Sequence, residues 1–148
     1  INQFGKMSKM LPFLPLYKKG LTKFQPIYVN DLSLMLYKLI INFEDYKNMN
    51  IPAVGNEIFT FKEILSHILD SLKKPKRFIN INSALAIIQG KLMEKLPNPL
   101  FTYDQYLSLS HDSISEGDQK FVCDIIDRDL SNMKTVTATY LDKFLDRV

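Results

Sequence analysis

Hydrophobic residues recur at helical spacing along residues 30–43, which predicts an amphipathic helix in this stretch. A polar residue at its start, Asn30 or Asp31, is expected to cap the first amide groups. The preceding residues 24–29 predict a short strand, in which Pro26 fits only an edge or a strand start. The apolar positions of the helix are Leu32, Met35, Leu36, Leu39, Ile40 and Phe43.

The clearest local pattern is Thr60 followed three positions later by Glu63, which is typical of a capping box. Phe59 and Ile64 occupy the two positions of a hydrophobic staple around it. The pattern predicts a helix over residues 61–72. Its expected buried stripe is Phe61, Ile64, Leu65, Ile68, Leu69 and Leu72.

Residues 51–54 and 78–81 predict two further short extended segments, and the first is followed by a turn at Gly55 and Asn56. Ser83 is expected to cap another helix. This helix carries Ile87, Ile88, Leu92 and Leu96 and is ended by Pro97 and Pro99.

Thr102 with Gln105 repeats the capping-box pattern and predicts a short helix carrying apolar residues. The polar residues 110–119 predict a loop. A last helix is expected to be capped near Ser131 or Asn132. The inward residues expected of these two helices are Tyr106, Leu107, Leu109, Met133, Val136, Tyr140, Leu141 and Phe144.

The order of these elements predicts an α/β fold, mostly helical, with two or three short strands. Residues 1–148 are expected to form a single lobe. A strand as short as residues 51–54 is not stable alone and needs a sheet to join. The pattern is therefore typical of one half of an α/β protein.

Composition excludes several classes of protein. With 46% hydrophobic and 24% charged residues among 148, the chain is typical of a soluble globular domain. No apolar stretch approaches the roughly 20 residues that span a bilayer. One cysteine, Cys123, excludes an internal disulfide, and two histidines exclude a zinc-type ligand cluster. Ile1 is not an initiator Met and no signal peptide follows it, so we expect the chain to begin inside a longer gene product.

Charge is unevenly distributed along the chain. Residues 1–100 carry 14 basic and 7 acidic side chains, whereas residues 101–148 carry 5 and 9. Lysine (16) far outnumbers arginine (3), and this argues against bidentate recognition of phosphates or bases, so no nucleic-acid partner is expected. An AT-rich genome explains the lysine abundance equally well.

No residue pattern indicates a nucleotide site or a catalytic centre in this chain. The five glycines are too dispersed for a dinucleotide fingerprint or a P-loop. We interpret His67 as a structural residue beside the apolar stripe. His111, with Asp112 and Ser113 next to it, is interpreted as part of a solvated loop. The predicted catalytic, cofactor-binding and metal-binding sets are therefore empty.

Two surface features could mediate contacts. The basic cluster that follows the helix of residues 61–72 could attract phosphate or anionic lipid, although a solvated helix end is the favoured interpretation. The apolar residues 11–16, followed by Lys18 and Lys19, could dock on a membrane or a partner subunit, or could cover the core. The basic cluster is Lys73, Lys74, Lys76 and Arg77.

Several strings resemble the C-terminal half of extended or atypical short-chain dehydrogenases. FQPIYVND at residues 24–31 precedes one amphipathic helix, and VGNEIFTF at 54–61 precedes another. MLPFLPL at 10–16, LPNP at 96–99 and LFTYDQ at 100–105 resemble the family of the NAD(P)H-binding accessory subunit of respiratory complex I, alpha-subcomplex subunit nine. The resemblance covers nearly the whole chain, but residues 113–132 match poorly.

The resemblance implies a protein whose N-terminal Rossmann half holds NAD(P)H, and that half lies outside this sequence. The chain would be the helical substrate-side lobe, with the Rossmann half or respiratory complex subunits as partners and a possible peripheral membrane contact. It would reside in the cytoplasm or the mitochondrial matrix, on the inner face of the respiratory membrane. The chain departs from the family at four positions: Val54 and Asn56 replace Gly and Pro, and Asn80 and Asn82 replace prolines.

Two functions follow from the resemblance. The first is a non-catalytic fragment, or an accessory or assembly subunit, of a respiratory NADH dehydrogenase. The alternative is the substrate-binding lobe of an NAD(P)-dependent dehydrogenase, epimerase or reductase. Under the alternative, Gln25 and Tyr28 are the expected substrate contacts, because they end a strand that faces the cleft in the family.

Overall fold

The computed structural model describes residues 7–8, 11–75, 77–95, 99, 102–115, 117 and 119–141 of the chain. The chain divides into two compact units. Unit 1 is drawn from Ile1–Phe24, Phe59–Ser113 and Thr137–Val148. Unit 2 is drawn from Gln25–Ile58 and Ile114–Val136.

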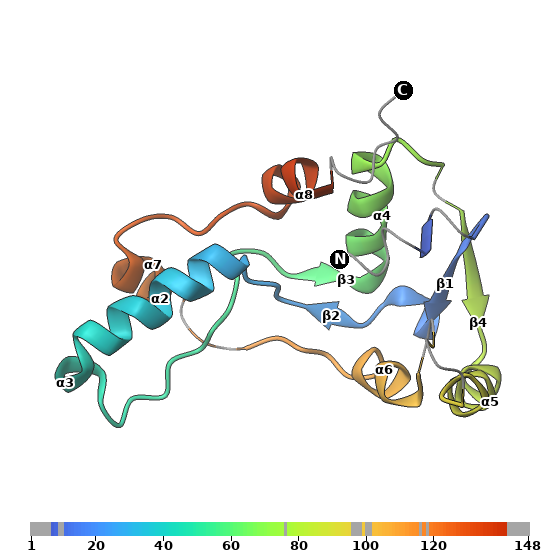
Figure 1. Ribbon diagram of the computed structural model, residues 1–148, viewed down its shortest axis with the longest axis horizontal. Coiled ribbons are helices and arrows are strands. Elements are labelled where there is room, and N and C mark those ends of the chain that lie inside the picture. Colours follow the sequence, from blue (N-terminus) through green and yellow to red (C-terminus); the bar gives the residue numbers. More distant parts are fainter. Residues whose placement is uncertain are drawn as a thin grey trace. The chain divides into compact units, whose positions relative to one another are not determined.

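Two small sheets lie in unit 1. Strand β1 (Leu14–Tyr17) pairs in parallel with β4 (Phe78–Ile81), and the two run side by side in Figure 1. Strand β2 (Lys23–Phe24) pairs antiparallel with β3 (Phe59–Thr60). A single 3₁₀ turn, η1 (Lys18–Gly20), follows β1.

The helices of unit 1 close around one apolar core. They are α4 (Phe61–Ser71), α5 (Ser83–Met93) and α6 (Tyr103–Ser108), together with the last turns of α8 (Met133–Leu141). Helices α5 and α6 approach closely at Gly90, where an added Cβ would lie 2.8 Å from the backbone N of Tyr103. The buried core consists of Met7, Leu14, Leu16, Tyr17, Phe61, Leu65, Ile68, Leu69, Leu72, Ala86, Tyr106 and Leu141.

Unit 2 is smaller and contains α2 (Val29–Ile41), α3 (Phe43–Tyr46) and α7 (Gln119–Ile126). Helix α2 packs along α7, as Figure 1 shows. The buried residues between them and the adjoining loops are Met35, Val54, Val122, Ile125, Ile126 and Leu130.

The α/β class and most of the predicted helices are confirmed. Both capping boxes are present: Thr60 with Glu63 begins α4, and Thr102 with Gln105 begins α6. Asn132 caps α8, since its Oδ1 accepts from the backbone N–H of Lys134 at 2.8 Å. The six residues expected to form the stripe of α4 all lie in the unit 1 core or against it.

Two predicted strands are wrong. Of the strand expected at residues 24–29, only Phe24 lies in a ladder, as the second residue of β2. The chain leaves the ladder at Gln25, whose backbone and side chain bond to Gly55 instead. Residues 51–54 form no strand, since Val54 is buried by side-chain packing in the core of unit 2. Conversely, the apolar stretch 11–16 contains part of β1, which was not predicted.

Helix ends and faces also differ from expectation. Asn82, not Ser83, caps α5, because its Oδ1 accepts from the N–H of Ala84 at 2.9 Å. Helix α2 begins at Val29 without a side-chain cap. Three residues of the stripe predicted for α2 and its end are exposed: Leu36, Ile40 and Phe43.

Helix α7 was missed altogether, although Val122, Ile125 and Ile126 have helical spacing. Several predictions concern positions outside the described residues: Lys76, residues 96–98, Phe144 and the side chain of Tyr140. Within the described segments, no helix is both long enough and apolar enough to span a bilayer.

Candidate functional site

The C-terminal end of α4 has a Schellman motif, which turns the chain sharply and places basic residues at the surface. Lys73 adopts the left-handed conformation with φ 52°. Its N–H donates to Asp70 O at 3.0 Å, and the N–H of Lys74 donates to Leu69 O at 2.9 Å. These two bonds satisfy carbonyls that the helix end would otherwise leave without a partner.

The same turn connects to the sheet. The backbone O of Arg77 accepts from the N–H of Leu14 at 2.9 Å, just before β4 pairs with β1. Lys74 reaches towards the N-terminal segment, where its Nζ donates to Ser8 O at 2.9 Å. The apolar stretch and the basic cluster of the sequence are therefore neighbours in unit 1.

Between them lies a surface pocket of about 480 Å³. Leu14 and Leu69 are almost completely buried beneath it, whereas Leu11 and Phe13 are 36% and 47% exposed. Its lining contains two cationic side chains and no carboxylate among the described residues. The lining residues are Ser8, Leu11, Pro12, Phe13, Leu14, Leu69, Lys74, Pro75 and Arg77.

This lining offers groups that can bind a ligand, namely two cationic side chains and an apolar surface. Its described residues include no histidine, cysteine or carboxylate. Positive charge beside apolar surface suits a ligand that is itself anionic at one end and apolar at the other. We call this feature the α4 pocket.

Gln25, the first predicted substrate contact, is buried in unit 2 and forms hydrogen bonds through both the nitrogen and the oxygen of its amide. Its Nε2 donates to Gly55 O at 3.0 Å, and its Oε1 accepts from the N–H of Ser115 at 3.2 Å. Its backbone O also accepts from the N–H of Gly55 at 3.4 Å. The side chain thus holds two distant loops together.

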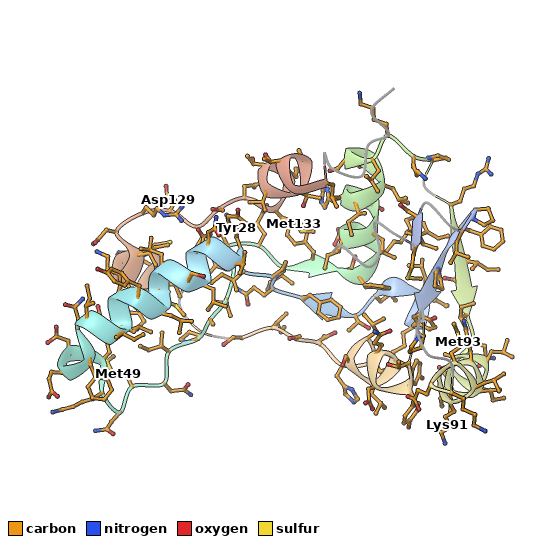
Figure 2. The ribbon with its side chains drawn as sticks, viewed as in Figure 1. Tyr28, Met49, Lys91, Met93, Asp129 and Met133 are labelled. Carbon is orange, nitrogen blue, oxygen red and sulfur yellow. The ribbon has the colours of Figure 1, made fainter. Side chains whose placement is uncertain are left out.

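Tyr28, the second predicted contact, lies beside the first turn of α2 and is labelled in Figure 2. It is half-buried, and its hydroxyl accepts from Nδ2 of Asn30 at 2.9 Å. The structure does not bring Tyr28 and Gln25 to a common pocket among those it describes.

A buried ionic cluster in unit 2 was not predicted. The Asp31 carboxylate accepts from Arg128 Nη2 at 2.5 Å and from the N–H and hydroxyl of Ser131 at 2.8 and 3.0 Å. The Asp31 side chain is 1% exposed and that of Arg128 45%. The partners lie almost a hundred positions apart, so no local sequence pattern joins them.

The histidines have structural surroundings. His67 packs edge-on against Phe59, with 5.4 Å between ring centroids. His111 is exposed, and its neighbours support β2: Asp112 Oδ1 accepts from the N–H of Lys23 at 2.8 Å, and Ser113 donates to Lys23 O at 2.7 Å. The loop interpretation missed this role of Asp112 and Ser113.

Glu63 has a perturbed pKa for structural reasons. The backbone N–H and the hydroxyl of Thr60 donate to its carboxylate at 2.7 and 2.8 Å. These bonds hold the pKa of Glu63 below its ordinary value. The perturbation belongs to the helix cap and marks no reactive site.

No family model matches the chain. It is 28% identical over 131 residues to "NADH dehydrogenase [ubiquinone] 1 alpha subcomplex subunit 9, mitochondrial" of Arabidopsis thaliana. The matched region covers 82% of this chain and 33% of that protein. The protein of the same name from Dictyostelium discoideum is 30% identical over 109 residues, covering 71% of this chain and 30% of the relative. The resemblance seen in the sequence strings is thereby confirmed. The chain spans about a third of the length of these curated relatives.

Proposed function

We propose that the chain is the C-terminal, substrate-side lobe of a protein of this kind and serves as a non-catalytic accessory or assembly subunit of a respiratory NADH dehydrogenase. The observation that carries the proposal is the similarity, along 82% of the chain, to a subunit named for that enzyme. The binding groups in the lining of the α4 pocket are consistent with a role in contacts to other molecules.

The cofactor would be held elsewhere in the full protein. The relatives are about three times as long as their matched regions, which leaves room for an N-terminal Rossmann half that binds NAD(P)H. In this proposal the short β strands and helices of the chain form the lobe that covers the cofactor cleft. The Rossmann half and subunits of the respiratory complex are then its partners.

The proposed location is the mitochondrial matrix or, in a bacterium, the cytoplasm, at the inner face of the respiratory membrane. Both relatives carry the word mitochondrial in their names. The exposed apolar side chains of Leu11 and Phe13, beside Lys74 and Arg77, support a peripheral contact with that membrane or complex.

The alternative, a substrate-binding lobe of a dehydrogenase, epimerase or reductase, needs side chains that are free to meet a substrate. Gln25 would have to give up two hydrogen bonds to do so. Tyr28 would have to give up only the bond from Asn30. Tyr28 is therefore the residue on which the alternative depends.

Titration of the 148-residue chain with NADPH tests whether the chain binds the cofactor by itself. We expect no saturable binding, because the chain has no glycine-rich turn to receive the pyrophosphate. Binding with micromolar affinity would contradict the proposal of a lobe without its own cofactor site.

Deletion of the gene in its own organism tests the accessory role. We expect less assembled NADH dehydrogenase and restoration by the wild-type gene. Restoration by Tyr28→Phe as well would be expected of an accessory role, whereas failure of Tyr28→Phe despite normal accumulation of the protein would favour the enzymatic alternative.

A further inference from the structure

The α4 pocket combines an apolar wall with two cationic side chains. Its volume of about 480 Å³ falls in the range of roughly 300–1,000 Å³ found for small-molecule sites. All of the described lining residues belong to unit 1.

The positive side of the pocket is held in place by the backbone. Lys74 is fixed by the Schellman motif, and its ammonium group uses one donor on Ser8 O, which leaves two N–H groups for a ligand. Arg77 is fixed through its carbonyl, which accepts from Leu14, and its side chain is exposed. Among the described residues, the ion pairs involve other cations, so neither charge is neutralised there.

The apolar side is formed by a buried floor and an exposed rim. Leu14 and Leu69 are 2% and 3% exposed, whereas Phe13 at the rim is 47% exposed. A bare phosphate would leave this apolar surface in water, and a purely apolar ligand would leave both cations without an anion. A molecule with an anionic head and a hydrocarbon chain satisfies both surfaces.

We propose that the α4 pocket binds one anionic amphiphile, with its phosphate or carboxylate at Lys74 and Arg77 and its hydrocarbon chain against Phe13, Leu14 and Leu69. The ligand is either a phospholipid at a membrane surface or a free amphiphile in solution. The proposal does not require the accessory role, because it rests on the pocket of unit 1 alone.

The chain contains no tryptophan, so Phe13→Trp introduces a single fluorescent reporter at the rim. We expect decyl phosphate to shift its emission to the blue with saturation, because the alkyl chain displaces water from the indole. Inorganic phosphate is expected to cause no shift. No emission shift with decyl phosphate would overturn the proposal. An equal shift with inorganic phosphate would overturn it as well.

Vesicle flotation of the wild-type chain tests the source of the ligand. We expect binding to vesicles that contain phosphatidylglycerol, and Lys74→Gln with Arg77→Gln should weaken it about tenfold or more. Lys62→Gln with Lys95→Gln removes the same charge from exposed positions outside the pocket and should weaken it much less. Decyl phosphate binding without flotation would support a free amphiphile as the ligand.

Equal losses in the two double variants would overturn the proposal, because they would show attraction by net charge alone. Arg77→Gln by itself is a second test, since no described hydrogen bond or ion pair involves its guanidinium and the variant is expected to fold normally. It should weaken decyl phosphate binding to the Phe13→Trp chain severalfold. An unchanged affinity in that variant would also count against the pocket.

Discussion

Unit 1 and unit 2 are stabilised by different kinds of interaction. Unit 1 has the larger apolar core, and two of its helices, α4 and α6, begin with capping boxes whose partners lie three positions apart. Unit 2 has a smaller core, and buried polar side chains connect its distant segments: Gln25 to Gly55 and Ser115, and Asp31 to Arg128 and Ser131. The comparison teaches that short-range sequence patterns fix the starts of helices in unit 1, although Thr22 also bonds to the distant Leu109 there. In unit 2, the ends of the segments are joined by long-range bonds of Gln25 and Asp31.

The largest effect is expected from breaking the ionic cluster of unit 2. Arg128→Met leaves the buried carboxylate of Asp31 without its cation, which should lower the free energy of unfolding by about 3 kcal/mol. Lys38→Met removes the cation of the exposed pair with Asp127 in the same unit and should cost less than about 1 kcal/mol. Urea unfolding measures both, and equal costs would contradict the importance assigned to burial.

The next largest effect is expected from removing the side-chain amide of Gln25. Gln25→Leu leaves the N–H of Ser115 and the carbonyl of Gly55 without their partner, so we expect a loss of about 2 kcal/mol. Gln89→Leu is the matched change in unit 1, where the amide contacts only Met93 Sδ at 3.7 Å among described partners. Thermal unfolding should show a clear loss for the first variant and about 0.5 kcal/mol or less for the second.

A smaller effect is expected at the cap of α4 in unit 1. Thr60→Ala should cost about 1 kcal/mol, and Thr60→Ser, which keeps the hydroxyl, should cost little. Because the pKa of Glu63 is lowered in the fold, its contribution is complete above its ordinary pKa of 4.5 and is lost as the pH falls through the lower value. The cost of Thr60→Ala should therefore shrink in acid; a cost that grows below pH 4.5 would argue against the box.

The smallest effect has the opposite sign. Lys73 ends α4 in the left-handed conformation, which glycine adopts without strain from a Cβ. Lys73→Gly should raise the free energy of unfolding by up to about 1 kcal/mol, whereas Lys73→Ala should leave it nearly unchanged. A lower free energy of unfolding for Lys73→Gly, measured in urea, would show that backbone strain at Lys73 does not reduce the stability of the protein.

The two units also differ in how much of them the sequence predicts. The capping box at Thr60 and Glu63 is a local pattern, and its helix begins at the expected residue. The strand expected at residues 51–54 is absent because burial of Val54, rather than backbone pairing, fixes that segment. Asp31 was one of two candidates, with Asn30, for capping a helix, yet its carboxylate bonds to Arg128 through folding of distant segments.

The candidate site could be predicted only in its parts. The apolar stretch at residues 11–16 and the basic cluster that begins at Lys73 are both visible in the sequence. Their meeting depends on the parallel pairing of Leu14 with Phe78, which neither stretch indicates alone. The same pairing buries Leu14 and Leu16 and leaves Phe13 exposed, so the stretch serves both the core and the surface.

The most direct test of the accessory role is native electrophoresis of membranes from the source organism with the chromosomal copy of the protein carrying an affinity tag. After mild detergent extraction, we expect the tagged protein to migrate with the NADH dehydrogenase activity band and with its core subunits identified by mass spectrometry. Migration at low mass, away from every NADH dehydrogenase band, in cells whose tagged protein is fully expressed would contradict the account.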